Sequence, residues 1–174
     1  MGPLELRPYP GSGWYQAGHP RRQRATYHRT QGTEQFLGFY DVHSDVLVGQ
    51  DRKRRTHRDL LAVFERLRAC YDESLRIYLV MDNLSSHRHP NPSVKIFYDA
   101  NNIEPVWTPT YSSWLNAIEA HLSGIRKFAI NGSDEPSHDH RRCRIQRYLT
   151  WRNQQHPTKG CSLSRFRYIK LDRH

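Results

Sequence analysis

The chain has few cysteines and no long apolar run. Its 174 residues include three cysteines, Cys70, Cys143 and Cys161, which are too few and too widely spaced for a disulfide framework. No apolar stretch approaches the roughly 20 residues that a membrane-spanning helix needs, and the N-terminus shows no apolar signal region. These absences argue against a disulfide-rich secreted domain and a helical membrane protein. They favour a reducing cytoplasm, and for a bacterial protein an association with the nucleoid.

Acidic residues are scarce relative to basic ones. The chain has 27 Lys and Arg residues against 17 Asp and Glu, which gives a formal net charge of +10. A basic surplus attracts polyanions, of which nucleic acid is the commonest. The basic residues also form runs at Arg21–Arg24, Arg52–Arg55 and Arg141–Arg144. This grouping favours nucleic-acid binding over an evenly basic surface. The length of the chain predicts one domain.

Proline and glycine are concentrated at the N-terminal end, at Pro3, Pro8, Pro10, Gly11, Gly13, Gly18 and Pro20. This density excludes a regular helix or a central strand and predicts an extended arm over residues 1–32. Trp14 precedes several arginines, and such a combination can stack on bases and bind phosphates. Alternatively, Trp14 anchors the arm to the core. The residues expected to contact DNA are Trp14, Arg21, Arg22, Arg24, Arg52, Lys53, Arg54 and Arg55.

The middle of the chain alternates between strand and helix patterns. Strands are predicted over residues 35–42 and 45–50, with a tight turn between them. Apolar residues at helical spacing predict a helix over 56–70, with Thr56 as its N-cap. The mostly continuous apolar run over 75–81 is typical of a strand that is covered on both faces.

The second half continues this alternation. We predict a short helix over 93–100 and a short strand over 103–108. The next helix begins with Ser112 or Ser113 as its N-cap and ends near residue 130. A last helix over 139–153 is expected to bury Ile145, Tyr148, Leu149 and Trp151. The order of elements implies an α/β fold with a mixed sheet flanked by helices on both faces.

Two carboxylates have settings that suit metal chemistry. Asp82 directly follows the predicted strand over 75–81, and Glu119 lies in the helix that follows Ser113. Taken singly, Asp82 is an ordinary strand-end turn residue and Glu119 an ordinary solvent-facing helical residue. Together they provide oxygen ligands of the kind that Mg²⁺ prefers, and paired divalent ions support phosphodiester transfer. In a basic chain the pair predicts phosphodiester chemistry that depends on Mg²⁺ (or Mn²⁺).

The motifs around both carboxylates resemble those of a known family. They are Val80-Met-Asp-Asn83 with His87, Trp107-Thr-Pro-Thr-Tyr111, and Ser113-Trp-Leu-Asn-Ala-Ile-Glu119. With further likeness in the arm and in Tyr148–Asn153, the chain resembles the DDE transposases of the insertion-sequence-630 group, relatives of the mariner transposases. The resemblance covers residue 1 to about residue 155. It implies an RNase H-like fold, a divalent-metal cofactor, and double-stranded DNA at transposon ends and target sites as the substrate.

The catalytic triad of the family maps onto this chain only in part. Its second and third acidic positions match Asp82 and Glu119. Its first Asp stands on a strand that ends in Asp-Glu just before the Pro-rich arm, and this sequence begins inside the arm. We therefore expect three parts: an arm over 1–32, a partial RNase H-like catalytic domain over 33–155 without its first strand, and a basic tail over 156–174.

Several other residues are candidates for the site. The family suggests that Asn83 and His87 orient the metal site or contact DNA, although His87 could instead cap a helix. Asn116 stands one helical turn before Glu119, where it could bond the carboxylate, bond a phosphate of the DNA strand that is cut, or serve only in packing. Asp41, and less strongly Glu5 and Glu34, are alternatives for the first carboxylate. The set His138, His140 and Cys143, with His156 or Cys161, matches no strong zinc motif.

Three functions remain open from the sequence. The first is the catalytic portion of a DDE transposase, impaired in this chain, which nicks DNA and transfers strands and which could form homodimers. The second is a non-catalytic DNA-binding remnant that inhibits an intact transposase by forming mixed dimers. The third is another RNase H-like nuclease, such as a hydrolase of RNA–DNA hybrids, against which the Trp114-to-Glu119 pattern argues.

Overall fold

The structure is a computed structural model that describes residues 1–19, 22–23, 31–54, 56–82, 92–110, 112 and 115–155. It is a mixed α/β fold with one antiparallel and one parallel sheet and with helices α1, α3, α4 and α5. Within those residues, no helix is both long and apolar enough to cross a membrane. The predicted tail over 156–174 lies outside the described part of the chain.

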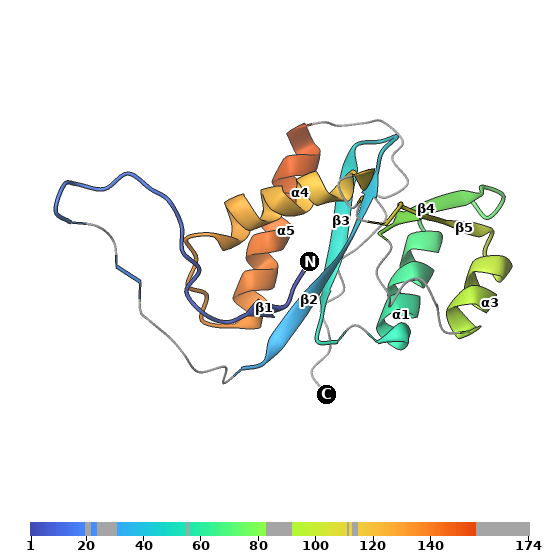
Figure 1. Cartoon of the computed structure of the whole chain (residues 1–174), viewed down its shortest axis with the longest axis horizontal. Coiled ribbons are helices and arrows are strands. Elements are labelled where there is room, and N and C mark those ends of the chain that lie inside the picture. Colours follow the sequence, from blue (N-terminus) through green and yellow to red (C-terminus); the bar gives the residue numbers. More distant parts are fainter. Residues whose placement is uncertain are drawn as a thin grey trace.

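A hairpin of β2 (Thr33–Asp41) and β3 (Val46–Arg52) forms the centre of the fold (Figure 1). The strands are antiparallel from Gln35 opposite Arg52 to Asp41 opposite Val46, so both predicted strands and the turn between them are confirmed. Gly38 lies opposite Gly49, and the ring of Phe36 covers this pair. A Cβ atom on Gly49 would stand 2.2 Å from that ring, so only glycine fits the approach.

The first five residues of the predicted arm belong to the sheet. Strand β1 (Leu4–Glu5) pairs antiparallel with the start of β2, and Met1 exchanges two backbone hydrogen bonds with Phe36. The register changes by one residue at Gly2–Pro3, which is a β-bulge. The start of the predicted arm is therefore extended and pairs with β2 through its backbone groups. The chain leaves the body only after Tyr9 has bonded the backbone of Gly132 and Ser133 (Figure 1).

The second sheet contains β4 (Ile77–Met81) and β5 (Ile103–Trp107), which are parallel and in register from Ile77 opposite Ile103 to Met81 opposite Trp107. Among the described residues it shares no backbone ladder with the hairpin. The predicted mixture of antiparallel and parallel strands is present, divided between two sheets. A common helical layer joins the two sheets instead.

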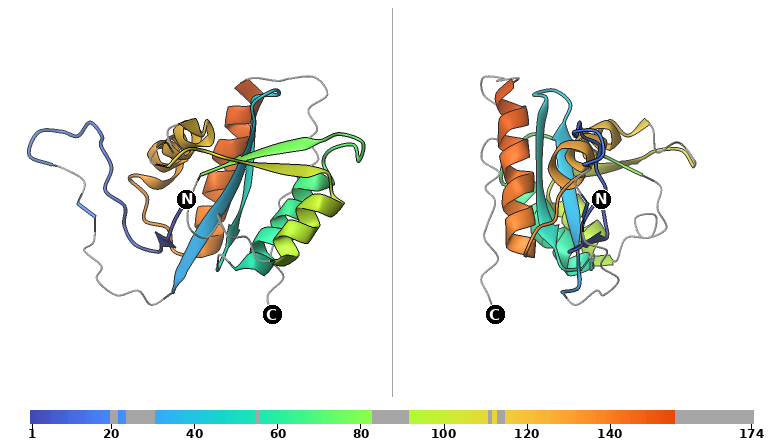
Figure 2. Two further views of the ribbon diagram at one scale, coloured as in Figure 1. Left: turned by 45° about the vertical axis from the view of Figure 1, so that its right-hand side comes forward. Right: turned by 90° about the vertical axis from the view of Figure 1, so that its left-hand side faces the viewer.

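That layer consists of α1 (His57–Arg68) and α3 (Pro92–Ala100) (Figure 2). Thr56 caps α1 as predicted, in a reciprocal capping box with Asp59. Phe39 of β2 and Leu79 of β4 both pack into the two apolar clusters beneath this layer. The same helices thus hold the two sheets beside each other through side chains alone.

The other face of β4 and β5 is open. Tyr78 is 60% exposed, Val80 49% and Val106 39%, whereas Ile77 and Leu79 point into the helical layer. The prediction that residues 75–81 are covered on both faces is therefore wrong. The reason is that α4 (Ile118–Ile125) and α5 (His138–Gln155), which cover the equivalent face of the hairpin, do not extend over β4 and β5.

On the hairpin, α4 continues into a π-helical turn, η2 (Arg126–Ile130), before Gly132 turns the chain. Ile125, Ile130, Ile145 and Leu149 pack with Phe36 and Leu47 into the main core. The predicted last helix is confirmed, and Ile145 and Leu149 are buried, but Trp151 is 54% exposed. Helix α4 begins at Ile118 rather than at Ser112 or Ser113, which makes it shorter than expected.

A buried ion network fixes the start of α5 to the hairpin. The carboxylate of Glu34 on β2 accepts hydrogen bonds from Arg141 and Arg142, and His138 lies 3.4 Å from it. The side chains of Glu34 and Arg141 are each only 2% exposed. Two guanidinium groups on one buried carboxylate make this contact the most strongly polar in the core.

Candidate active site

Asp82 lies at the carboxyl end of β4. The preceding residue, Met81, pairs with Trp107, and the Met81 carbonyl accepts a 2.9 Å hydrogen bond from the amide of Thr108. The ladder therefore brings Asp82 next to Thr108 at the end of the parallel pair. Asp82 is partly exposed, and it has interactions with its surroundings.

Two further side chains stand at this end of the strands. Thr108 is only 6% exposed, and its Oγ1 has no hydrogen-bond partner among the described residues. Tyr98 of α3 donates its hydroxyl to Sδ of Met81, and burial raises the pKa of Tyr98 to about 12. Sequence reasoning did not single out Thr108, although it stands inside the Trp107-to-Tyr111 motif. Buried hydroxyls are usually hydrogen-bonded, so Thr108 is a further candidate for contact with a ligand.

Glu119 lies in the first turn of α4 and is exposed. The first turn of a helix favours a carboxylate because the free backbone amides there carry partial positive charge. Asn116 accepts from the Ile118 amide through Oδ1 and from the Glu119 amide through its carbonyl. Asn116 therefore organises the start of the helix. The prediction that it bonds the Glu119 carboxylate is not what these contacts show.

A cluster of polar side chains holds α4 against the hairpin. The ring of His121 packs on Tyr40 with centroids 4.0 Å apart, and the Tyr40 hydroxyl donates to Asp45. Arg152 of α5 pairs with Asp45 and lies over the Tyr40 ring. Burial, then the positive charge of Arg152, lowers the pKa of His121 despite the opposing effect of Asp45. Neutral His121 thus fixes the helix that carries Glu119 on β2.

The three alternatives for a first carboxylate have structural partners. Oδ1 of Asp41 accepts from the amides of His43 and Ser44 in the hairpin turn, and Oδ2 accepts from the Tyr71 hydroxyl. Burial alone would raise the pKa of Asp41, but these hydrogen bonds outweigh it and lower the pKa. Glu34 is committed to the network on α5, and Glu5 pairs with Arg7. Each of the three carboxylates therefore has a local role in the fold.

The donor atoms at the site suit a hard cation, since Asp82 and Glu119 supply carboxylate oxygens. Over the described ranges, however, no group of three or more His, Cys, Asp or Glu residues is close enough together to hold a metal ion. Asn83 and His87, which the sequence analysis assigned to this site, lie outside the described residues.

The suggested zinc cluster has other partners. Nε2 of His138 bonds the Gln31 carbonyl, and its Nδ1 faces Arg141 and Glu34. Nδ1 of His140 bonds the Ser137 hydroxyl, and Cys143 is an exposed free thiol. His156 and Cys161 lie outside the described residues. These contacts leave no zinc-like arrangement among His138, His140 and Cys143.

The residues that were predicted to contact DNA differ in how exposed they are. Trp14 is 104% exposed, so it does not anchor the arm to the core, and Arg22, Lys53 and Arg54 are exposed. Arg52 is partly buried and donates to Gln50. Arg21, Arg24 and Arg55 lie outside the described residues.

Most arginines of the run Arg141–Arg144 form ion pairs within the fold. This run is one of the three that favoured nucleic-acid binding. Arg141 and Arg142 are on Glu34, and Arg144 pairs with Glu135. These charges are neutralised by carboxylates, so the basic surface open to DNA is smaller than the sequence suggested.

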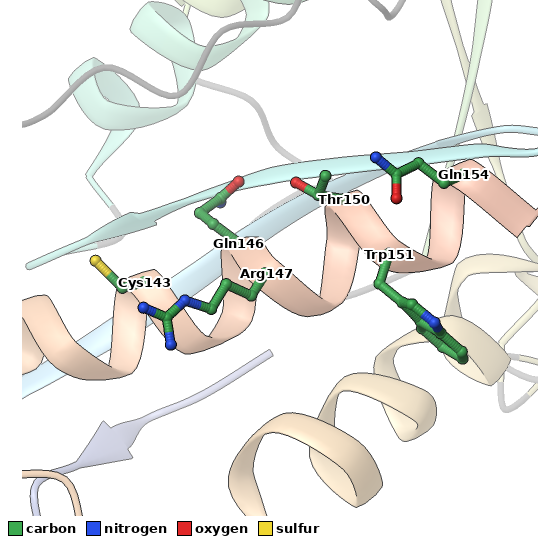
Figure 3. Close-up of a pocket in the computed structure, with 6 residues that line it drawn as sticks. All are labelled: Cys143, Gln146, Arg147, Thr150, Trp151 and Gln154. Atoms are coloured by element: carbon green, nitrogen blue, oxygen red, sulfur yellow. The ribbon is translucent and has the colours of Figure 1, made fainter.

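A shallow recess lies along the outer side of α5. Its volume is about 410 Å³, and Figure 3 shows the residues that line it: Cys143, Gln146, Arg147, Thr150, Trp151 and Gln154. All six belong to one helix, and neither Asp82 nor Glu119 is among them. The recess is therefore separate from the candidate active site.

Comparison with known proteins identifies the family of the chain. The family model of the DDE superfamily endonucleases matches residues 3–139, a span that contains Asp82, Thr108 and Glu119. No curated protein matches the chain. The mixed α/β architecture with antiparallel and parallel strands is consistent with a nuclease fold of this type. The chain belongs to the DDE superfamily of endonucleases.

Proposed function

We propose that this chain is the catalytic portion of a DNA transposase of the insertion-sequence-630 and mariner-related group. Its reaction is hydrolysis of phosphodiester bonds at transposon ends, followed by transfer of the freed 3′-hydroxyl to target DNA. The observation that carries the proposal is the placement of the two carboxylates that the resemblance singles out: Asp82 directly follows β4, and Glu119 lies in the first turn of α4.

Asp82 and Glu119 would hold Mg²⁺ (or Mn²⁺), because their oxygens are the ligands that hard cations take. Bound divalent ions activate the attacking oxygen and stabilise the leaving oxygen in phosphodiester transfer. The role of the protein is positional. The ladder to β5 and Tyr98 fix the end of β4, while His121 and Tyr40 fix α4 on the hairpin.

The resemblance calls for a third carboxylate, and the described residues place none beside Asp82 and Glu119. In the family it stands on the first strand of an RNase H-like sheet, just before the arm. The separation of the two sheets in this structure is what supports the same assignment here, since a strand between them would make one sheet. The division into an arm, a catalytic domain and a tail belongs to this proposal too.

DNA binding rests on exposed basic and aromatic residues. Arg22, Lys53 and Arg54 supply charge, and the exposed Trp14 ring supplies a surface for stacking on bases. Replacement of Lys53 and Arg54 by alanine is expected to weaken binding to all DNA sequences. It should also lower the slope of log affinity against log salt by roughly 1 for each phosphate that is no longer neutralised. A homodimer is a further expectation for a transposase that acts on two DNA ends.

The test is metal-dependent nicking of supercoiled plasmid by the full chain. Asp82→Asn and Glu119→Gln should each abolish nicking in Mg²⁺ and Mn²⁺ and leave salt-dependent DNA binding unchanged. Asp99→Asn and Glu73→Gln are matched controls, because both residues are exposed and lie away from the strand ends. Undiminished metal-dependent nicking by both active-site variants would contradict the proposal.

A second candidate is a non-catalytic DNA-binding protein that inhibits an intact transposase. It is favoured by the absence of a three-carboxylate cluster from the described residues. This candidate predicts no nicking by the wild type, with DNA affinity that falls steeply as salt rises. Nicking that is lost in Asp82→Asn would exclude it.

A further inference from the structure

Two exposed aromatic rings stand on neighbouring helices beside the main core. Phe128 lies on the π-helical turn η2 and is 60% exposed, and Trp151 lies on α5 and is 54% exposed. Tyr148 joins them, because its ring centroid is 5.9 Å from that of Phe128 and 6.0 Å from that of Trp151. These three residues form the aromatic row. Exposed apolar side chains usually occur singly, so a contiguous row with two exposed rings points to an interaction surface.

The fold holds the middle ring of the row in place. Tyr148 packs against the main apolar core, and its hydroxyl lies on α4 at Gly124, where a Cβ atom would stand 2.6 Å from the hydroxyl oxygen. The rings of Phe128 and Tyr148 are inclined by only 16°, so their planes are nearly parallel. A row that is fixed in advance loses little conformational freedom when a planar ligand binds, which favours affinity.

The turn that carries Phe128 brings a cation to the row. Residues Arg126–Ile130 form a π-helical turn, a rare element that often occurs at functional sites. The ammonium nitrogen of Lys127 lies 5.5 Å from the centroid of the Phe128 ring. At the other end of the row, Figure 3 shows Arg147 and Trp151 on successive turns of α5, where both line the shallow recess. Each exposed ring therefore has a basic side chain in its neighbourhood.

The segments that carry the row are basic throughout. Residues 120–133 and 140–155 contain no Asp or Glu, whereas they contain seven Lys and Arg residues, two in the first segment and five in the second. Four of the arginines pair with carboxylates from other parts of the chain. Exposed and without a carboxylate partner among the described residues are the other three, Arg126, Lys127 and Arg147. The charge of this surface suits an anionic ligand.

We infer that the aromatic row is a binding surface for single-stranded DNA. Bases stack on the exposed rings of Phe128 and Trp151, and phosphates lie along the three cations. Aromatic rings combined with basic side chains bind single strands without reading their sequence, because every base has a face that can stack. A duplex fits the row less well, since its bases already cover one another. The choice of DNA rests on the endonuclease family to which the chain belongs.

The row is separate from the carboxylate site. Phe128 stands nine residues after Glu119 along the continuous helix of α4 and η2, which corresponds to roughly 14 Å along the axis. Asp82 follows β4 in the other sheet. The inference therefore adds a second DNA surface to the proposed function, and substitutions in the row leave both proposed metal ligands in place.

The first experiment measures how the full chain binds a fluorescein-labelled oligo-dT of about 15 nucleotides, by fluorescence anisotropy in EDTA. Trp151→Ala should lower the affinity by roughly fivefold or more, because a stacked base loses its ring. Trp151→Phe keeps a ring and should retain most of the affinity. The matched control is Tyr78→Ala, which removes a similarly exposed ring from the open face of β4 and should leave the affinity unchanged.

The second experiment separates stacking from charge. A blunt duplex of the same length is the reference ligand, and Trp151→Ala should change its affinity by less than about twofold, because its bases are covered. The double variant Lys127→Gln, Arg147→Gln should lower the slope of log affinity for oligo-dT against log salt by about 1.4, which is about 0.7 for each phosphate. Lys95→Gln, at an exposed position of α3, is the control and should leave the slope unchanged.

Three results would each overturn the inference. The first is an affinity for oligo-dT that is the same in Trp151→Ala as in the wild type, or that falls equally in Tyr78→Ala. The second is a wild-type dimer that Trp151→Ala dissolves in sedimentation velocity without DNA, since a second copy would then cover the row. The third is tighter binding of oligo-U than of oligo-dT.

The inference and the proposed reaction fail independently. Asp82→Asn, which should abolish nicking, should bind oligo-dT as tightly as the wild type does. A wild type that does not nick but loses oligo-dT affinity in Trp151→Ala would contradict the reaction and support the surface. Metal-dependent nicking with no effect of Trp151→Ala on oligo-dT binding would do the opposite.

Discussion

The hairpin and the parallel pair differ in how completely they are enclosed. Strands β2 and β3 have helices on both faces, and side chains of α5 cap the outer edge of β3. Strands β4 and β5 have α1 and α3 on one face only and leave Tyr78, Val80 and Val106 exposed on the other. The ion pairs differ in the same way. The Glu34 network on the hairpin is buried, whereas the pair of Arg76 and Glu104 at the parallel strands is exposed.

The difference separates a well-enclosed sheet, the hairpin, from a sheet with one exposed face, the parallel pair. A closed hairpin supplies a stable base for α4 and hence for Glu119. The parallel pair supplies Asp82 from a less enclosed sheet.

The largest expected effect is loss of the buried network. Glu34→Ala would leave Arg141 and Arg142 without their common carboxylate, and removal of one partner from a buried pair costs about 3–5 kcal/mol. Urea unfolding monitored by circular dichroism measures the change. The control is Glu104→Ala, whose exposed pair with Arg76 contributes below about 1 kcal/mol. Equal losses in the two variants would contradict the comparison.

A smaller effect is expected within β4 itself. Leu79→Ala removes a side chain that packs into both apolar clusters and should lower the free energy of unfolding by about 2–3 kcal/mol. Val80→Ala, on the open face of the same strand, should change it by less than about 0.5 kcal/mol. The same unfolding experiment compares them. A large loss in Val80→Ala would mean that the open face is covered in solution.

Removal of the edge cap should cost less again. Asn153→Ala takes away both hydrogen bonds to Leu47 and leaves its backbone groups unpaired, at about 1–2 kcal/mol. The Leu47 amide should then exchange faster. Gln154→Ala, at the exposed neighbouring position, should change neither stability nor exchange. If Leu47 stays protected in Asn153→Ala, the cap is not what protects this edge.

The smallest effect is a pH dependence at His121. Its folded pKa lies below the value of about 6.5 that an unfolded chain has, so its contribution to stability is full above that pH and is lost as pH falls through the folded pKa. His121→Gln should therefore flatten the stability profile below about pH 6.5. Urea midpoints at several pH values measure this. His43→Gln, at an exposed turn position, should leave the profile unchanged.

Local patterns in the sequence were sufficient for much of the fold. Alternation predicted the hairpin, and Thr56 followed by Asp59 marked the start of α1. The start of α4 was misplaced because Asn116 bonds the amides of the first helical turn, so the helix begins at Ile118. Trp151 was misassigned because the buried stripe of α5 follows Ile145 and Leu149, and two residues on the helix turn by about 200°.

Long-range arrangement could not be obtained in the same way. An apolar run such as 75–81 does not reveal whether its second face finds a covering helix, because that depends on where α4 and α5 pack. Both carboxylates were singled out by their motifs, and the structure places Asp82 at a strand end and Glu119 at a helix start. Thr108 was missed because burial of its hydroxyl depends on the ladder between β4 and β5.

Residue-resolved amide exchange of the unmodified protein is the most direct measurement of how the two edges of the hairpin differ. The account predicts slow exchange at Leu37, Phe39 and Leu47, and fast exchange at Gly38 and Tyr40. This pattern, alternating along one strand, would show a hairpin capped on one edge and open on the other. Exchange at Gly38 and Tyr40 as slow as at Leu37 and Phe39 would contradict it, because the β2 edge would already be occupied.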